Sequence, residues 1–188
     1  MPYKFRFYID NHLHFVAPLK CEQCEGTTKS GQQCGRTTCI GTNWCYQHLM
    51  SAKHLRIQTS IIPESGKGLF AKDGKKGEND IVFKTNDRII AYDGELITNE
   101  TLMERYGSYT APYGIQISKR QNEDGALHRG IGSLVNHPPH NGRSNARFSV
   151  SKQRIVLVAT KNIRNNQEIF VNYGRDYRFN ELATHKTK

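Results

Sequence analysis

The chain has 188 residues and a formal net charge of +10. This length suits one ordinary domain with a small appendage, and the mean hydropathy of -0.69 predicts a soluble, loop-rich fold. No apolar run approaches the roughly 20 residues of a membrane helix, and the first residues lack the apolar core of a signal peptide. We therefore expect no membrane segment and a reducing compartment.

The positive charge is spread along the chain. Its 27 Lys and Arg residues favour proximity to an anionic partner such as nucleic acid. They form no arginine-rich block and no strip interleaved with aromatic residues, so the charge alone does not indicate direct reading of nucleic acid.

The predicted elements are mainly short strands. "KFRFYI" alternates charged with aromatic or apolar residues, which is typical of a half-buried strand. After a cysteine-rich segment, only "NETLMERYG" predicts a helix, with Thr98 or Asn99 as its N-cap and Gly107 as its stop. The other runs read as strands separated by turn residues: "LRIQTSII", "DIVFK", "DRIIAYDGELI", "YGIQIS", "GSLVNH", "ARFSVS", "RIVLVAT" and "EIFVNY". The sequence therefore predicts a mostly β fold.

The cysteine-rich segment contains a candidate metal site. All five cysteines lie between Cys21 and Cys45, and such an odd cluster without a secretory signal favours metal ligation over disulfides. The spacing C-x9-C-x10-C-x2-H predicts a structural zinc site with four protein ligands, Cys24, Cys34, Cys45 and His48. The pattern resembles the zinc knuckles attached to viral and phage proteins. Cys21 and Cys39 remain alternative ligands, and thiols without a metal remain the alternative interpretation.

"SGKGLFA" matches G-x-G-x-x-A at Gly66, Gly68 and Ala71. A dinucleotide site needs this motif between a buried strand and a helix. Pro63 interrupts the approach and "KDGKKGEND" is too rich in glycine and charge for a helix, so we do not expect a Rossmann domain. A β-turn or a close backbone approach to a ligand remain open.

Four motifs occur in one order: "SGKGLFA", "AYDGELI", "GIGSLVNHPP…SNARF" and "NQEIFVNYGRDYRF". Together they resemble the SET-domain family of protein lysine methyltransferases, and most closely its compact viral members. The resemblance covers residues 55–179. It implies several small sheets, a pseudoknot-like C-terminal threading and few short helices, preceded by a zinc-binding segment at residues 1–54 and followed by a flexible basic tail at residues 180–188.

The resemblance also implies the site. Tyr92 and Tyr173 are expected at the channel for the substrate lysine, where Phe148 leaves room for di- or trimethylation. S-adenosylmethionine is expected at a set of residues from three motifs: Lys67, Gly68, Leu69, Asn136, His137 and Tyr177. The family commonly has serine after its Asn-His pair, whereas this chain has Pro138 and Pro139, which make the path rigid and remove N–H donors. We expect His137 to hold the local backbone in shape and to contact the cofactor, and we do not expect it to act as a base or as a zinc ligand.

The expected substrate is a lysine on a basic tail, with histones as the leading candidate and nucleosomal DNA as a further contact. Such an enzyme would work in the nucleus, or the host nucleus if viral, with the cytoplasm as the alternative. A basic peptide needs acidic groups near the channel, and the candidates are Glu95, Glu100, Glu104, Glu123 and Asp124. A non-catalytic SET-like scaffold and a zinc-dependent protein- or nucleic-acid-binding module are the alternative functions.

Overall fold

The computed structural model describes residues 4–9, 12–18, 21–38, 43–127, 130–140 and 142–177. The predicted basic tail and Cys39 lie outside these residues. Within them the chain is mostly β, as predicted. The elements run in the order β1 (Lys4–Ile9), β2 (His12–Pro18), β3 (Glu22–Gln23), β4 (Thr37–Thr38), α1 (Tyr46–Lys53), β5 (Leu55–Thr59), β6 (Lys67–Ala71), β7 (Ile81–Phe83), β8 (Arg88–Ala91), β9 (Glu95–Thr98), α2 (Asn99–Tyr106), β10 (Gly114–Ser118), β11 (Gln121–Asp124), a 3-10 helix (Ile131–Leu134), β12 (Ala146–Ser151), β13 (Arg154–Ala159) and β14 (Ile163–Arg164).

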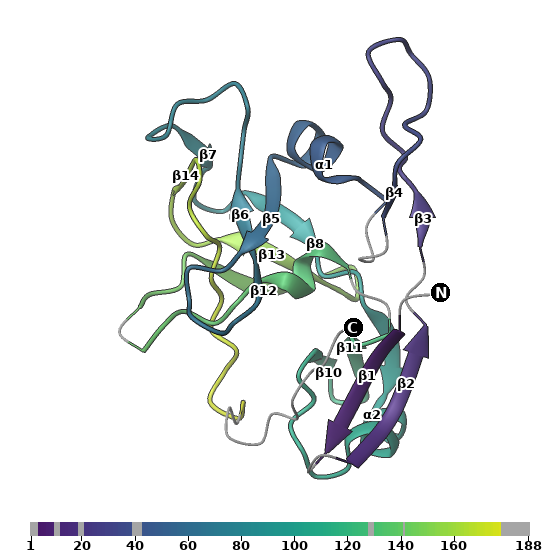
Figure 1. Ribbon diagram of the computed structural model, residues 1–188. Coiled ribbons are helices and arrows are strands. Elements are labelled where there is room, and N and C mark those ends of the chain that lie inside the picture. The colour runs from purple at the N-terminus through teal and green to yellow at the C-terminus, as the bar shows by residue number, and fades with distance from the viewer. Residues whose placement is uncertain are drawn as a thin grey trace.

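The strands form several small sheets. Two described sheets have three strands each, in the orders β10-β11-β9 and β12-β13-β8, and four are two-stranded pairs, β1-β2, β3-β4, β5-β6 and β7-β14. Figure 1 shows β5, β6, β8, β12 and β13 gathered at the centre, while the β7-β14 pair and the β10-β11 region with α2 lie on opposite sides of them. The loop between β3 and β4 projects from the body of the molecule (Figure 1).

The C-terminal segment 168–171 passes between segments from earlier in the chain. It makes bridges of Phe70 with Glu168, Asn136 with Phe170, and Ala146 with Val171. This crossing places the end of the fold against both β6 and the Asn-His segment. It is the threading that the SET fold implied.

One buried cluster lies beneath the central strands. Its members include Leu49, Leu55, Leu69, Phe83, Ile131, Leu157, Ile163 and Ile169. Each such side chain contributes about 1.5–3 kcal/mol when it leaves water. The cluster joins α1, β5 and β6 to the strands of the second half, so the cysteine-rich segment shares the core through Leu49.

The helix prediction was right for α2 and wrong in omitting α1. Thr98 caps α2 by accepting from the Thr101 backbone N–H at 3.3 Å, and the helix ends at Gly107. α1 was not predicted because Leu49 is its one buried residue, so its sequence shows no helical repeat of apolar residues. No helix among the described residues is long and apolar enough to cross a membrane.

Two predicted strands are replaced by other structures. The first half of "GSLVNH" lies in the 3-10 helix, where a Cβ on Gly132 would lie 2.6 Å from the Ala91 carbonyl oxygen, and Asn136 forms an isolated bridge. This close approach holds the turn against the end of β8. "EIFVNY" forms isolated bridges instead of a strand because it crosses several segments. The strands β2, β3, β4, β6, β11 and β14 were not predicted, and the glycine motif at residues 66–71 forms strand β6 where a β-turn was one interpretation.

Candidate active site

Four of the predicted site residues line one cavity of about 690 Å³. Tyr92 follows β8, Phe148 lies on β12, and Tyr173 and Tyr177 follow the crossing segment. The opposite wall comes from α2 and the chain leading into β10, including Leu102, Met103, Tyr109, Tyr113 and Ile115. Aromatic and apolar side chains make up most of the lining, and polar side chains such as Asn99, Gln116 and Asn122 complete it.

The hydroxyl groups of Tyr92 and Tyr173 donate to backbone carbonyls. Tyr92 Oη donates to the Tyr113 carbonyl oxygen at 2.7 Å, and Tyr173 Oη donates to the Val135 carbonyl oxygen at 2.7 Å. A phenol has one hydroxyl hydrogen, and here that hydrogen is engaged. Each phenol consequently offers a ligand the lone pairs of its oxygen.

Burial also fixes the protonation state of these phenols. Burial raises the pKa of Tyr92 well above its ordinary value, and the nearby charge of Asp124 adds to the shift. Burial likewise raises the pKa of Tyr173 and of Tyr177. The free phenol has a pKa of about 10, so all three side chains are neutral at physiological pH.

His137 positions the backbone of Tyr173. The Tyr173 N–H donates to His137 Nδ1 at 3.2 Å, and the two rings meet edge to face with centroids 5.5 Å apart. Burial lowers the pKa of His137, which favours the neutral ring that such an acceptor nitrogen requires. His137 therefore contacts both the backbone and the ring of Tyr173, and its expected contact with the cofactor stays a prediction.

The other predicted cofactor residues meet around a buried carboxylate, Glu168. Asn136 Nδ2 donates to Glu168 Oε1 at 3.0 Å and to the Lys67 carbonyl oxygen at 3.2 Å. A Cβ on Gly68 would lie 2.1 Å from Glu168 Oε1, so only glycine fits at that position. The three residues 67–69 belong to strand β6, and the Leu69 side chain is fully buried in the core. Asn136 directly follows Val135, which lines the tyrosine cavity, but neither Asn136 nor residues 67–69 line that cavity.

Glu168 was not singled out from the sequence. Its exposed fraction is 2%, and it accepts further hydrogen bonds from Ser60 Oγ and the Ile61 N–H, both at 2.8 Å. A glutamate directly before the apolar residues "IFV" was the available signal. The hydrogen bonds of Glu168 join the chain after β5 to Asn136, so this carboxylate organises the segment around Gly68 and Asn136.

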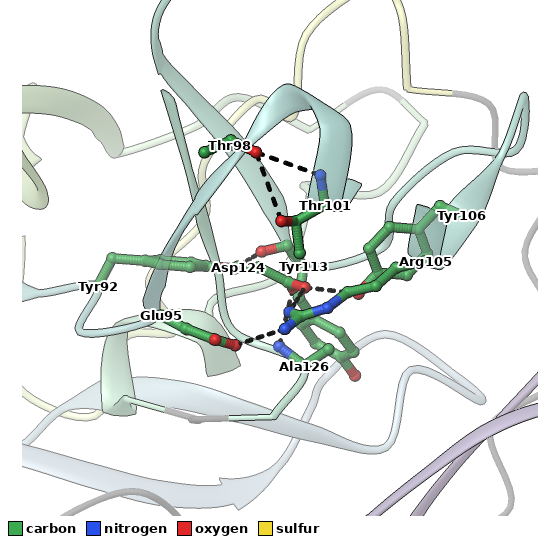
Figure 2. A network of polar contacts seen from close by, with 9 residues as sticks. All are labelled: Tyr92, Glu95, Thr98, Thr101, Arg105, Tyr106, Tyr113, Asp124 and Ala126. Atoms are coloured by element: carbon green, nitrogen blue, oxygen red, sulfur yellow. Dashed lines mark hydrogen bonds and ion pairs between the residues drawn. The ribbon is translucent and has the colours of Figure 1, made fainter. Parts of the chain in front are cut away.

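A second buried network supports the α2 wall (Figure 2). Asp124 is fully buried, and its Oδ2 accepts from Arg105 Nη1 at 2.9 Å and from Tyr106 Oη at 2.8 Å. Figure 2 shows the Arg105 guanidinium between Asp124 and Glu95. The network ties α2 to β11 close to Tyr92.

The acidic groups expected to attract a basic peptide lie outside the cavity, and three of them form ion pairs with arginines. Glu123 is fully buried, accepting from the Gly94 N–H at 2.9 Å and pairing with Arg154 at 3.2 Å. Asp124 and Glu95 pair with Arg105. None of the five candidates lines the cavity, whereas the exposed Asp176 does. Asp176 is therefore the acidic side chain placed to meet a bound cation.

The predicted metal ligands form one cluster. The ligand atoms of Cys24, Cys34, Cys45 and His48 all lie within 4.8 Å of one another, and the three cysteines are free thiols. His48 Nδ1 lies 3.3 Å from Cys24 Sγ and 3.4 Å from Cys45 Sγ. Cys21 is disulfide-bonded and stands outside the cluster. This set of three thiols and one imidazole fits the donor atoms that a structural zinc ion prefers.

The groups around the cluster favour the thiolate at Cys45 and the required histidine tautomer, whereas burial raises the pKa of Cys24 despite two backbone hydrogen bonds to its sulfur. Cys24 Sγ accepts from the Gly26 N–H at 3.3 Å and from the Cys45 N–H at 3.2 Å. Burial raises the pKa of Cys45, but hydrogen bonds from the backbone of His48 and Gln47 outweigh it and bring the pKa to about 6. His48 Nε2 lies 3.0 Å from the Thr27 carbonyl oxygen, so it carries the hydrogen and leaves Nδ1 for a metal.

A model of the SET domain matches residues 66–174, more than half of the chain. The chain therefore belongs to the SET-domain family, which agrees with the motifs, the threading and the small sheets. No curated protein matches it in sequence.

Solved structures of polycomb repressive complex 2 from Chaetomium thermophilum share the fold. The complex in an autoinhibited conformation bound to S-adenosylmethionine is 24% identical, with a TM-score of 0.52 over 67% of this chain and 16% of that chain. A crystal structure of the complex is 24% identical, with a TM-score of 0.53 over 71% of this chain and 17% of that chain. The complex with H3K27me3 and H3K27M is 22% identical, with a TM-score of 0.52 over 73% of this chain and 17% of that chain. The chain thus spans about a sixth of the chains it resembles, and identities this low speak for the fold alone.

Proposed function

We propose that the protein is an S-adenosylmethionine-dependent protein lysine N-methyltransferase. The observation that carries this proposal is the pair of phenols, Tyr92 and Tyr173, which line one largely aromatic cavity with their hydrogens engaged by backbone carbonyls. Membership in the SET-domain family supports the same reaction. The groups proposed to hold the cofactor are the β6 residues Lys67 and Gly68 together with Asn136.

The reaction requires an uncharged lysine amine, yet free lysine has a pKa of about 10.4. An aromatic cavity disfavours the ammonium form because it removes that group from water. When bound, S-adenosylmethionine supplies an electrophilic methyl group on a positively charged sulfur. The residues of the cavity would hold the lysine ε-nitrogen with its lone pair toward that methyl group, so that the N–C bond could form as the C–S bond breaks and the thioether leaves.

The phenols orient the amine. An amine N–H needs an acceptor, and the oxygens of Tyr92 and Tyr173 present lone pairs because their hydrogens point to Tyr113 and Val135. Both phenols are poor bases in the neutral state, so the proton leaves the ammonium for solvent before the transfer. Holding the nitrogen in line with the methyl group lowers the barrier by several kcal/mol, up to about 7–11 kcal/mol.

The proposed substrate is a lysine in a basic segment, with histone tails as the leading class. Polycomb repressive complex 2 in complex with H3K27me3 shares the fold, and Asp176 lines the cavity as an exposed acid that can meet a neighbouring cation. A histone substrate would place the enzyme in the nucleus. The net charge of +10 suits a contact with nucleosomal DNA.

Zinc is the proposed second ligand. Cys24, Cys34, Cys45 and His48 would hold it through four protein atoms, which leaves no open position for chemistry and gives the metal a structural role.

The test is methyl transfer from labelled S-adenosylmethionine to core histones and nucleosomes. Tyr173→Phe removes the hydroxyl at Val135 and keeps the ring, so we expect kcat to fall by about 100-fold or more. Loss of one hydrogen bond, about 1 kcal/mol, should lower the thermal unfolding midpoint by only about 2–4 °C. Tyr46→Phe is the matched control and should retain turnover, because Tyr46 is exposed and does not line the cavity. A wild-type protein that binds no S-adenosylmethionine would refute the proposal and leave the scaffold interpretation. Steeply salt-dependent nucleic-acid binding without any cofactor affinity would favour the binding module.

A further inference from the structure

The Cys/His cluster is joined to the proposed cofactor residues by a short, continuous path. Cys45 is the N-cap residue of α1, and His48 lies in the first turn of that helix. Two of the four ligand positions thus belong to the start of α1. Any metal held there constrains the helix directly.

α1 has few stabilising features of its own at its start. It has eight residues, no side-chain hydrogen bond at its N-cap and no acidic residue in its first turn. Isolated helices shorter than about 12–15 residues are marginal in water. Cys45 and His48 are three residues apart and therefore lie on one face of the helix. A metal bonded to both would fix the first turn.

Beyond His48, the helix enters the core. Leu49 has an exposed fraction of 1% and belongs to the same buried cluster as Leu55 and Leu69. The helix ends at His54, in the left-handed conformation with φ 53°, and β5 starts at the next residue. In Figure 1, α1 leads straight into β5.

β5 then pairs with the cofactor strand. Its register places Ile57 opposite Leu69, Gln58 opposite Gly68 and Thr59 opposite Lys67. Just past β5, Ser60 Oγ and the Ile61 N–H donate to Glu168, the carboxylate that also accepts from Asn136. Every proposed cofactor group on this edge is therefore held by the segment that follows the metal cluster.

We infer that the Cys24, Cys34, Cys45 and His48 cluster is a positioning element for cofactor binding: metal held there orders α1 and β5, which place Gly68 and Asn136. The inference rests on the proposed function, because it takes S-adenosylmethionine as the ligand of β6. Linkage is reciprocal, so metal raises the affinity for the cofactor by the factor by which cofactor raises the affinity for metal. We expect a factor of about 10, within the range of about 5–150 that such couplings cover.

The experiment measures both sides of this cycle on the full chain. Calorimetry gives the Kd of S-adenosylhomocysteine, the product form of the cofactor, for zinc-loaded and zinc-stripped protein. Competition with a chromogenic chelator gives the zinc Kd with and without saturating S-adenosylhomocysteine. The inference predicts two equal factors. Affinities that do not depend on the other ligand would overturn it while leaving the proposed function standing.

Variants separate ligation from mere folding. His48→Ala should weaken S-adenosylhomocysteine binding about 10-fold, His48→Cys should restore it because thiolate is an accepted zinc ligand, and exposed Gln47→Ala on the same helix should have no effect. A weakened His48→Cys variant that still holds one zinc per chain would contradict the inference.

Hydrogen exchange locates the effect. Metal removal should reduce protection in α1, β5 and β6 and leave β12 and β13 protected. Loss of protection throughout the chain would mean global unfolding and would overturn a local positioning role. A zinc-loaded protein that binds no S-adenosylhomocysteine would overturn both this inference and the proposed function, whereas a chain that binds S-adenosylhomocysteine but no zinc would overturn this inference alone.

Discussion

Removal of Arg105 should destabilise the α2 wall of the cavity. Asp124 is fully buried and Arg105 has an exposed side-chain fraction of 17%. Removing one partner of a buried pair costs about 3–5 kcal/mol. Asp124 keeps its hydrogen bonds from Tyr106 Oη and the Ala126 N–H, so we expect the lower end for Arg105→Met. A loss of about 3 kcal/mol lowers the thermal midpoint of a chain of this size by roughly 6–12 °C.

The functional consequence follows from the position of α2. Leu102 and Met103 of this helix line the cavity, whereas the proposed cofactor residues lie on β6. Arg105→Met should therefore raise KM for a lysine peptide more than it raises the Kd of S-adenosylhomocysteine. Differential scanning fluorimetry and steady-state kinetics measure the two effects, with exposed Arg88→Met as the control. A midpoint that falls no further than in the control would refute the reasoning.

Three further outcomes are expected. Gly26→Ala should abolish stoichiometric zinc binding, measured by metal analysis, because its Cβ would lie 2.2 Å from His48 Cγ, whereas Gly35→Ala, with open space around it, should retain zinc. Phe148→Tyr adds a hydroxyl inside the cavity and should lower the ratio of trimethyl to monomethyl product about 10-fold by mass spectrometry. Burial raises the pKa of Tyr173, so the stability it contributes is complete below about pH 10 and is lost as the pH rises further, because the unfolded chain releases its proton first. Urea unfolding between pH 8 and 11 should show this loss in the wild type and a smaller one in Tyr173→Phe.

The sequence predicted the parts of the fold that local patterns encode. Alternation marked β1, a short run between turn residues marked β12, and the Thr98 cap and Gly107 stop marked α2. α1 went unrecognised because a single buried residue gives no helical periodicity. Its existence depends on packing of Leu49 and on the neighbouring cysteine and histidine, which no local propensity describes.

The site was predictable only as a set of motifs. Tyr92, Phe148 and Tyr173 were named from their sequence context, and the structure brings them to one cavity. Tyr113 and Glu168 were missed because their importance lies in contacts with distant residues. Tyr113 acts through its backbone carbonyl, which any residue type possesses, so its side chain gave no clue to that contact.

Three buried carboxylates explain how a fold of such small sheets can hold a site on its connecting segments. Glu123 joins the Gly94 N–H to the Ile155 N–H, at 2.9 and 2.6 Å. Asp124 joins α2 to the turn after β11, and Glu168 joins the chain after β5 to Asn136. Each carboxylate has two oxygens and can therefore fix two segments that are remote in sequence. A short strand contributes few ladder hydrogen bonds, so these side chains supply the long-range order that a larger sheet would otherwise provide.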